Sequence, residues 1–169
     1  MLVIDQGQRI PKKKQKRDFC HLGGASVIHE MKEKDVEKIL KIEKQSFTTP
    51  WTDEMITETL LSPLYTGFVI EENNVLLGYI MLYSVLDEVH ILNLAVDPDC
   101  RGRGYASQLI HYIIEHYSKR GASYFFLEVR DSNIRAIKLY KMLGFEIKGK
   151  RKGYYTDTDE DALLMELSL

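Results

Sequence analysis

A glutamate within an apolar stretch is the first residue of this sequence that could do chemistry. Glu128 lies in Phe125-Phe126-Leu127-Glu128-Val129, a run that predicts a short buried strand. A carboxylate in such a strand is costly unless it is paired or has a chemical task. The residues alone leave three interpretations of Glu128: a general base, an ion pair with Arg130, or a solvent-facing strand position.

A tyrosine twelve positions later is a second candidate. Tyr140 shares the face of a predicted helix with Ala136, Ile137 and Leu143, so the ordinary interpretation is a core aromatic whose hydroxyl reaches the edge. A phenol with a pKa of about 10 is protonated at neutral pH and can act as a proton donor. The pattern itself does not separate packing from acid catalysis.

A glycine-rich turn is the most specific signal in the sequence. A buried strand is predicted at 87–97, and the turn Arg101-Gly102-Arg103-Gly104-Tyr105-Ala106 after it leads into a helix. Such a turn presents successive backbone N–H groups at the positive end of a helix, where a phosphate or pyrophosphate binds. It is neither a Walker loop nor the dinucleotide fingerprint Gly-x-Gly-x-x-Gly.

Hydrophobic periodicity predicts the elements that position these residues. Seven strands and four helices are expected in the order β-α-α-β-β-β-α-β-α-β-β, which describes a mixed α/β sheet with helices on both faces. The strand at 87–97 is apolar enough to be central and buried on both sides. Thr52 and Ser132 or Asn133 are predicted helix caps, and Asn73-Asn74 a tight hairpin turn. The expected ranges are strands at 27–31, 65–72, 75–86, 87–97, 124–129, 145–155 and 162–167, and helices at about 36–43, 52–61, 105–121 and 134–143.

Several short motifs, taken together, resemble one enzyme family. Arg101, Gly104 and Ala106 match the pyrophosphate-loop pattern Arg/Gln-x-x-Gly-x-Gly/Ala of the GNAT superfamily of acetyltransferases. Further matches, in family order, point to the RimI-type ribosomal-protein alanine acetyltransferases and span about residues 26–168. They are Phe47-Thr48-Thr49-Pro50-Trp51, Leu127-Glu128-Val129-Arg130, Ser132-Asn133, Ala136-Ile137, Leu139-Tyr140, Leu143-Gly144-Phe145, Tyr154-Tyr155 and Glu160-Asp161-Ala162.

The resemblance implies a fold and a reaction. The fold is the GNAT-like acyl-CoA N-acyltransferase fold, with about seven strands and about four helices. The reaction is direct transfer of acetyl from acetyl-CoA, as co-substrate, to the N-terminal amine of a protein, in this family type an alanine on a small-subunit ribosomal protein. An α-amine has a pKa of about 8, so a modest base suffices to deprotonate it.

The same resemblance implies roles for individual residues. Glu128 would be the general base, acting through water, and Tyr140 the general acid for the coenzyme A thiolate. Backbone N–H groups of Leu94, Ala95 and Val96 would stabilise the oxyanion and pair with the pantetheine arm. The remaining coenzyme contacts would be Arg101, Gly102, Arg103, Gly104, Tyr105, Ala106, Ser107 and Asn133; the acceptor walls would be Phe47, Trp51, Tyr154 and Tyr155.

Length and composition set the outer limits. The 169 residues, 44% apolar and 28% charged, suit one soluble globular domain, predicted at 26–169, and contain no run long enough for a membrane span. Neither the histidines nor the two cysteines are spaced like metal ligands, so no metal is expected. No secretory signal is visible, so cytoplasmic localisation is expected, and size alone favours a monomer.

The first 25 residues form a basic extension predicted to be disordered. Six cationic residues oppose two aspartates there: Arg9, Lys12, Lys13, Lys14, Lys16 and Arg17 against Asp5 and Asp18. Three interpretations stay open: a solvated tail or a misassigned start, a weak contact with ribosomal RNA, and a nuclear-import signal.

The identity of the acceptor also stays open. A second enzyme hypothesis keeps the fold and coenzyme but acetylates lysine side chains, a broader set of N-termini or a small amine. A non-enzymatic hypothesis is a coenzyme-A-binding, ribosome-associated module. Glu128 and Tyr140 together argue against it, because a module that only binds needs neither an acid nor a base.

Overall fold

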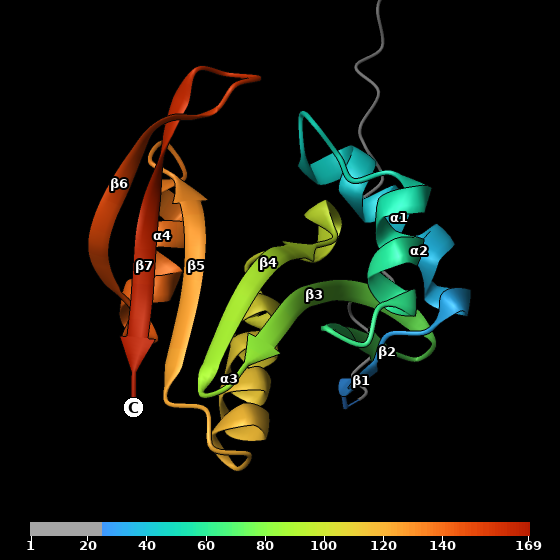
Figure 1. Cartoon of the computed structure of the whole chain (residues 1–169). Coiled ribbons are helices and arrows are strands. Elements are labelled where there is room, and N and C mark those ends of the chain that lie inside the picture. Colours follow the sequence, from blue (N-terminus) through green and yellow to red (C-terminus); the bar gives the residue numbers. More distant parts are fainter. Residues whose placement is uncertain (1–24) are drawn as a thin grey trace, which may run out of the picture.

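One seven-stranded sheet runs through residues 25–169, the part of the chain that the structure, a computed structural model, describes (Figure 1). Its strand order is β1-β2-β3-β4-β5-β7-β6. The elements follow the predicted order: β1 Val27–Glu30, α1 Val36–Ser46, α2 Asp53–Leu61, β2 Tyr65–Glu72, β3 Val75–Val85, β4 Glu88–Val96, α3 Tyr105–Ser118, β5 Tyr124–Arg130, α4 Ile134–Met142, β6 Glu146–Tyr155 and β7 Glu160–Ser168.

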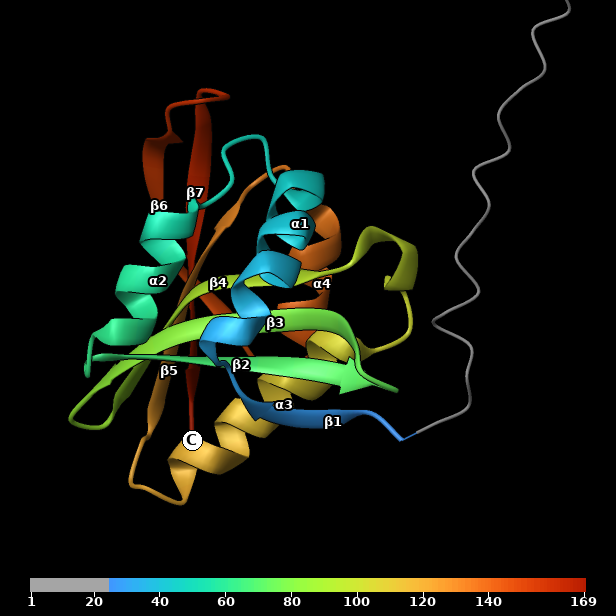
Figure 2. The same cartoon turned by 90° about the vertical axis from the view of Figure 1, so that its right-hand side faces the viewer.

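Helices cover both faces of the sheet, as predicted (Figure 2). Successive side chains of a strand point to opposite faces, and β2 shows the consequence. Phe68 and Ile70 pack in the core cluster under α3 and α4, whereas Val69 packs in the cluster under α1 and α2. Two apolar layers, one on each face, therefore stabilise the sheet.

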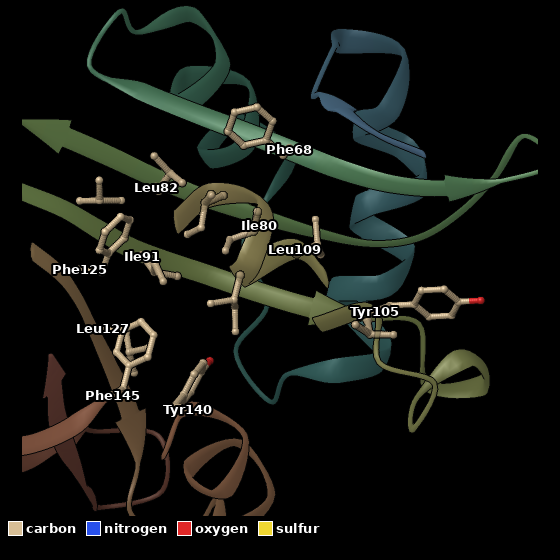
Figure 3. Packing of buried hydrophobic residues seen from close by; sticks show 14 of the residues in the cluster. Phe68, Ile80, Leu82, Ile91, Tyr105, Leu109, Phe125, Leu127, Tyr140 and Phe145 are labelled. Atoms are coloured by element: carbon tan, nitrogen blue, oxygen red, sulfur yellow. The ribbon is translucent and has the colours of Figure 1, made fainter. Parts of the chain in front are cut away.

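The larger core cluster fixes α3 against the sheet (Figure 3). Leu109, Ile110 and Ile113 of α3 are completely buried, at the spacing of one helical face. Phe125 of β5 lies in the same cluster. This packing fixes the start of α3, and with it the glycine-rich turn, relative to the central strands.

Local signals in the sequence behave as predicted. The Thr52 hydroxyl accepts a hydrogen bond from the Met55 N–H at 3.3 Å, and the Asn133 side chain accepts one from the Ala136 N–H at 3.1 Å. Asn73 and Asn74 have φ values of 49° and 65°, the left-handed pair that a two-residue hairpin turn requires.

The prediction that the strand at 87–97 is buried on both sides is wrong at Leu92. Leu92 is 40% exposed. The pairing of β4 with β3 joins Ile91 to Leu82 and Asn93 to Met81 and skips Leu92, which marks a β-bulge. A bulge re-aims the side chains around it and is frequent beside active sites.

Strands β4 and β5 are paired over only part of their length. They form the parallel pair of the sheet, and their register runs from Glu88 with Tyr124 to Ile91 with Leu127. Beyond that point the two strands diverge (Figure 1), while β4 stays paired with β3 as far as Val96. The sheet is thus opened between its fourth and fifth strands.

Residues 1–24 lie outside the described part, so the basic extension and the domain boundary stay predictions. No helix within residues 25–169 is long and apolar enough to cross a membrane. Over the same range, no group of three or more His, Cys, Asp or Glu side chains is placed to hold a metal ion.

Candidate active site

The open edge of β4 offers backbone groups to a ligand. Within the described residues, the pairing of β4 with β5 ends at Ile91, so one edge of the segment Leu94–Val96 has no partner on β5. Ladder N–H and C=O groups of a strand need hydrogen-bond partners. An extended chain lying along this edge can supply them as an added strand would.

The glycine-rich turn has the geometry of an anion site. Gly102 and Gly104 have φ values of 83° and 85°, a region that glycine enters at no steric cost. Gly104 is the N-cap of α3, so the first N–H groups of a fourteen-residue helix point outward here. A Cβ added at Gly104 would meet no protein atom within 4 Å, which leaves room for a phosphate group.

The Arg101 side chain braces the turn. Its Nε donates to the Val96 carbonyl at 3.0 Å, and its Nη2 donates to the Ser46 hydroxyl at 2.7 Å. Burial and the neighbouring Arg135 lower the pKa of Arg101. Arg101 thus joins the turn to β4 and to the end of α1, and its two hydrogen bonds to neutral groups leave its positive charge in place.

The rest of the predicted coenzyme loop contributes mainly backbone. The Tyr105 hydroxyl donates to the Glu72 carboxylate at 3.0 Å and also contacts Arg103. The Ser107 hydroxyl lies 3.3 Å from Nδ1 of His111. Since these side chains have protein partners, the backbone N–H groups of residues 104–107, with Ala106 among them, are what the turn offers to an anion.

Glu128 is the first residue of β5 beyond the last β4 partner. Its carboxylate lies 2.8 Å from the Arg151 guanidinium of β6, and the Glu128 side chain is 28% exposed. The Tyr154 hydroxyl also donates to it, and this bond raises the pKa of Tyr154. Glu128 is therefore paired, but with Arg151; Arg130, the partner considered from sequence, binds Asp157 and Glu160 instead.

Tyr140 is buried in the core cluster beneath the opening. Its ring lies 5.8 Å from that of Phe145, and its hydroxyl points away from α4 toward β4 (Figure 3). Burial, followed by the nearby Tyr155, raises the pKa of Tyr140 above its usual value. The phenol therefore keeps its proton throughout the physiological pH range.

The predicted acceptor walls come from two segments that are far apart in sequence. Phe47 and Trp51 lie in the loop between α1 and α2, and Tyr154 and Tyr155 lie at the end of β6. Phe47 is 37% and Tyr154 45% exposed. Tyr155 is more enclosed, and burial raises its pKa to about 12. Tyr154 and Tyr155 interact with Glu128 and place aromatic surface beside it.

A chain of polar contacts links these two segments. The Thr49 hydroxyl donates to Asp157 at 3.0 Å, and Asp157 accepts two bonds from Arg130, at 2.7 and 2.9 Å. The Arg130 guanidinium lies 4.0 Å above the Tyr155 ring, within range of a cation–π interaction. The contacts fix the loop between β6 and β7 against the loop between α1 and α2.

Three contributions were not visible in the sequence. The Arg135 guanidinium, on α4, lies 3.3 Å from the position that a Cβ at Gly102 would take. Arg151 holds the Glu128 carboxylate, and Thr49 holds the opposite loop. A charged residue on a polar helix or strand carries no local signal of the partner that tertiary folding gives it. Asn133 was predicted both as a helix cap and as a coenzyme contact, and the hydrogen bond that its side chain makes is the helix cap.

The arrangement can support transfer of an acyl group between two ligands. A phosphate-bearing chain can bind at the start of α3 and continue along the open edge of β4. Glu128 lies where that free edge of β4 begins, next to Tyr154 and Tyr155. A carboxylate, backbone N–H groups and a protonated phenol are the groups that proton removal, oxyanion stabilisation and leaving-group protonation require.

Comparison with known proteins agrees with this arrangement. Residues 36–145 match the model of the Acetyltransferase (GNAT) family. A candidate ribosomal protein bS18-alanine N-acetyltransferase of Bacillus subtilis (strain 168) is 37% identical over 145 residues, which are 85% of this chain and 96% of that protein. The ribosomal protein bS18-alanine N-acetyltransferase of Escherichia coli (strain K12) is 33% identical over 146 residues, 85% of this chain and 98% of that one.

The fold comparison gives the same result. The crystal structure of the ribosomal-protein-S18-alanine N-acetyltransferase from Escherichia coli superimposes with a TM-score of 0.80 at 33% identity, covering 85% of this chain and 94% of that one.

Proposed function

The chain belongs to the GNAT family of acetyltransferases, and we propose that it acetylates the α-amine of a protein N-terminus, an alanine of a ribosomal protein of the bS18 type. It is an acetyl-CoA-dependent N-acetyltransferase. Its relatives from Bacillus subtilis and Escherichia coli carry this acceptor in their names. The acceptor is the proposed part; the family, the fold and the co-substrate are its premise.

The proposed coenzyme site fits the chemistry of acetyl-CoA. The pyrophosphate would bind the N–H groups of residues 104–107, with Arg135 adding positive charge beside Gly102. The pantetheine arm would lie along the edge of β4 at Leu94, Ala95 and Val96, whose N–H groups would also stabilise the oxyanion.

Proton removal from the acceptor is assigned to Glu128. An α-ammonium with a pKa of about 8 is roughly one-tenth neutral at pH 7, so a carboxylate in contact with it, directly or through water, need only complete the deprotonation. Arg151 and Tyr154 orient that carboxylate.

Proton donation to the leaving sulfur is assigned to Tyr140. Its raised pKa makes it a weak acid, so we assign it hydrogen-bond donation to the developing thiolate, with proton transfer completed as the sulfur leaves. Its burial excludes water from the proposed position of the sulfur.

One observation carries the proposal: Glu128 directly follows the last β4–β5 pair, beside the free edge of a strand that leads to the glycine turn. The coenzyme path and the acceptor walls meet at this carboxylate.

Intact-mass analysis of peptides incubated with acetyl-CoA tests the acceptor. A peptide with the N-terminal sequence of bS18 should gain one acetyl group, and the same peptide with a blocked α-amine should gain none. A lysine-containing peptide with a blocked N-terminus is the matched comparison. Acetyl-lysine on that peptide, with no acetylation of any α-amine, would overturn the proposal.

A further inference from the structure

A fully buried carboxylate stands close to the candidate active site. Glu43, near the end of α1, has no solvent-accessible surface. One of its oxygens accepts from the Trp51 backbone N–H at 2.7 Å, and the other accepts from the Asn93 side-chain amide at 2.7 Å. Both donors are neutral, so hydrogen bonds alone compensate here for the loss of water around the carboxylate.

The two donors belong to the two halves of the proposed site. Trp51 is an acceptor wall in the loop between α1 and α2. Asn93 lies on β4, between the bulged Leu92 and Leu94, whose backbone is a proposed oxyanion donor. Glu43 is therefore the group that connects the acceptor loop to the acetyl-binding strand.

Burial of Glu43 has an energetic consequence. Burial raises its pKa, and the bonds from Trp51 and Asn93 oppose that rise. When the folded-state pKa of a carboxyl group is above its unfolded value, folding stability falls as the pH rises through the folded pKa. Ionised Glu43 thus costs folding free energy at neutral pH, and its two hydrogen bonds reduce that cost.

We propose that Glu43 is a positioning residue for acetyl transfer, holding the Trp51 loop and the Asn93 segment of β4 at a fixed separation. The inference rests on the proposed function, because it takes the acceptor to enter between these two segments. A carboxylate suits the task since it offers one accepting oxygen to each donor. Glutamine can replace it if the Asn93 amide turns over, so that the glutamine nitrogen donates to the Asn93 oxygen.

The chain offers a matched control on the same side of the fold. Asp35 precedes α1, is also completely buried, and accepts from the Lys32 N–H at 2.9 Å. Asp35→Ala removes a buried carboxylate at the other end of this helix, without a contact to Trp51 or Asn93. Glu43→Met keeps the side-chain volume but removes both accepting oxygens.

The first measurement does not depend on the acceptor. Trp51 is the single tryptophan of the chain, so its fluorescence reports on the acceptor loop directly. Glu43→Met should shift the emission to longer wavelength and increase quenching by acrylamide, whereas Glu43→Gln and Asp35→Ala should match the wild type. Unchanged emission and quenching in a folded Glu43→Met would overturn the proposal, even if peptide acetylation were never detected.

The second measurement is steady-state kinetics with the bS18-type peptide, per folded enzyme. Loss of hydrogen bonds to a charged group predicts a fall in kcat/KM of roughly 10- to 100-fold for Glu43→Met. Glu43→Gln should recover most of that loss, and Asp35→Ala should lose melting temperature but keep both constants. Equal constants for Glu43→Met and Asp35→Ala would mean that Glu43 only stabilises the fold.

Asn93→Ala removes only the hydrogen bond between Glu43 and β4. It also tests the proposal if Glu43→Met does not fold. It leaves the Trp51 bond in place, so kcat should fall while the peptide KM and the Trp51 emission stay at wild-type values. A wild-type kcat for Asn93→Ala would overturn the link to β4. Failure of the wild-type enzyme to acetylate any α-amine would instead count against the proposed function.

Discussion

The coenzyme half and the acceptor half of the site are built in different ways. The proposed coenzyme half consists of residues close together in sequence whose backbone would do the binding: a strand edge at 94–96, two glycines with positive φ, and the start of α3. The acceptor half depends on side chains brought together from distant segments, such as Thr49 with Asp157 and Arg151 with Glu128. A local motif can therefore specify the first half, whereas only the folded chain assembles the second.

The largest effect is expected where the two halves meet. Glu128→Gln keeps the volume of the side chain but removes the proposed base, so peptide turnover at pH 7 should fall by roughly 10²- to 10⁴-fold. The affinity for acetyl-CoA, measured by calorimetry, should stay within about twofold, because the pyrophosphate turn is untouched. Equal losses in turnover and in coenzyme affinity would show that the two halves are not separate.

Tyr140→Phe tests the proton donor from the coenzyme side. Loss of the hydroxyl should lower kcat by roughly 10²-fold and leave acetyl-CoA affinity unchanged. A thioester with a more acidic leaving thiol should restore part of the rate, since such a thiolate leaves without a proton. If kcat is unchanged, Tyr140 is a core aromatic and no more.

The glycine turn gives a purely electrostatic test of the coenzyme half. Gly104→Asp and Gly104→Asn have nearly the same shape, and both residue types tolerate positive φ better than most. Only the aspartate places a negative charge beside the proposed phosphates, so it should bind acetyl-CoA roughly tenfold more weakly than the asparagine variant at low salt. If calorimetry gives equal affinities for the two variants, the pyrophosphate does not bind at this turn.

The contrast between local motifs and contacts assembled by folding also explains how much of the structure the sequence could predict. Element order, the caps at Thr52 and Asn133 and the Asn73-Asn74 turn follow from local residue preferences, and the structure confirms them. The exposure of Leu92 was missed because a bulge is a property of the pairing with β3. The partner of Glu128 was missed because Arg151 reaches it only after β6 and β7 fold back on β5.

Glu43 illustrates the limit of sequence patterns. The sequence predicts a helix at about 36–43, and the structure shows that Glu43, in α1, is completely buried. What the pattern could not give is the pair of donors, since Trp51 lies beyond the end of the helix and Asn93 lies fifty residues away on β4. The roles of Glu128, Tyr140 and the coenzyme and acceptor residues likewise stay proposals, which the variants above test.

A smaller effect is expected at the contact that joins the two acceptor segments. Thr49→Val keeps the shape of the side chain and removes its hydrogen bond to Asp157. Exposed polar pairs contribute up to about 1 kcal/mol, so the peptide KM should rise by no more than about fivefold, with kcat and acetyl-CoA affinity unchanged. A fall in kcat would mean that this contact also positions the reacting groups.

No effect on peptide turnover is expected from deleting residues 1–24. Their sequence has little apolar character with which to anchor a core, and the site described here lies entirely within residues 25–169. The melting temperature and the kinetic constants with a short peptide should match those of the full chain. A large fall in melting temperature would show that residues 1–24 stabilise the fold.

The pH dependence of kcat/KM for the wild type and Glu128→Gln tests the central claim, that Glu128 deprotonates an acceptor α-amine where the two halves meet. Between pH 6 and 9 the variant should gain rate more steeply than the wild type, because a rising pH deprotonates the amine without help. The gap between the two profiles should narrow toward pH 9. Two profiles separated by a constant factor, or coincident, would contradict the assignment of Glu128 as the base.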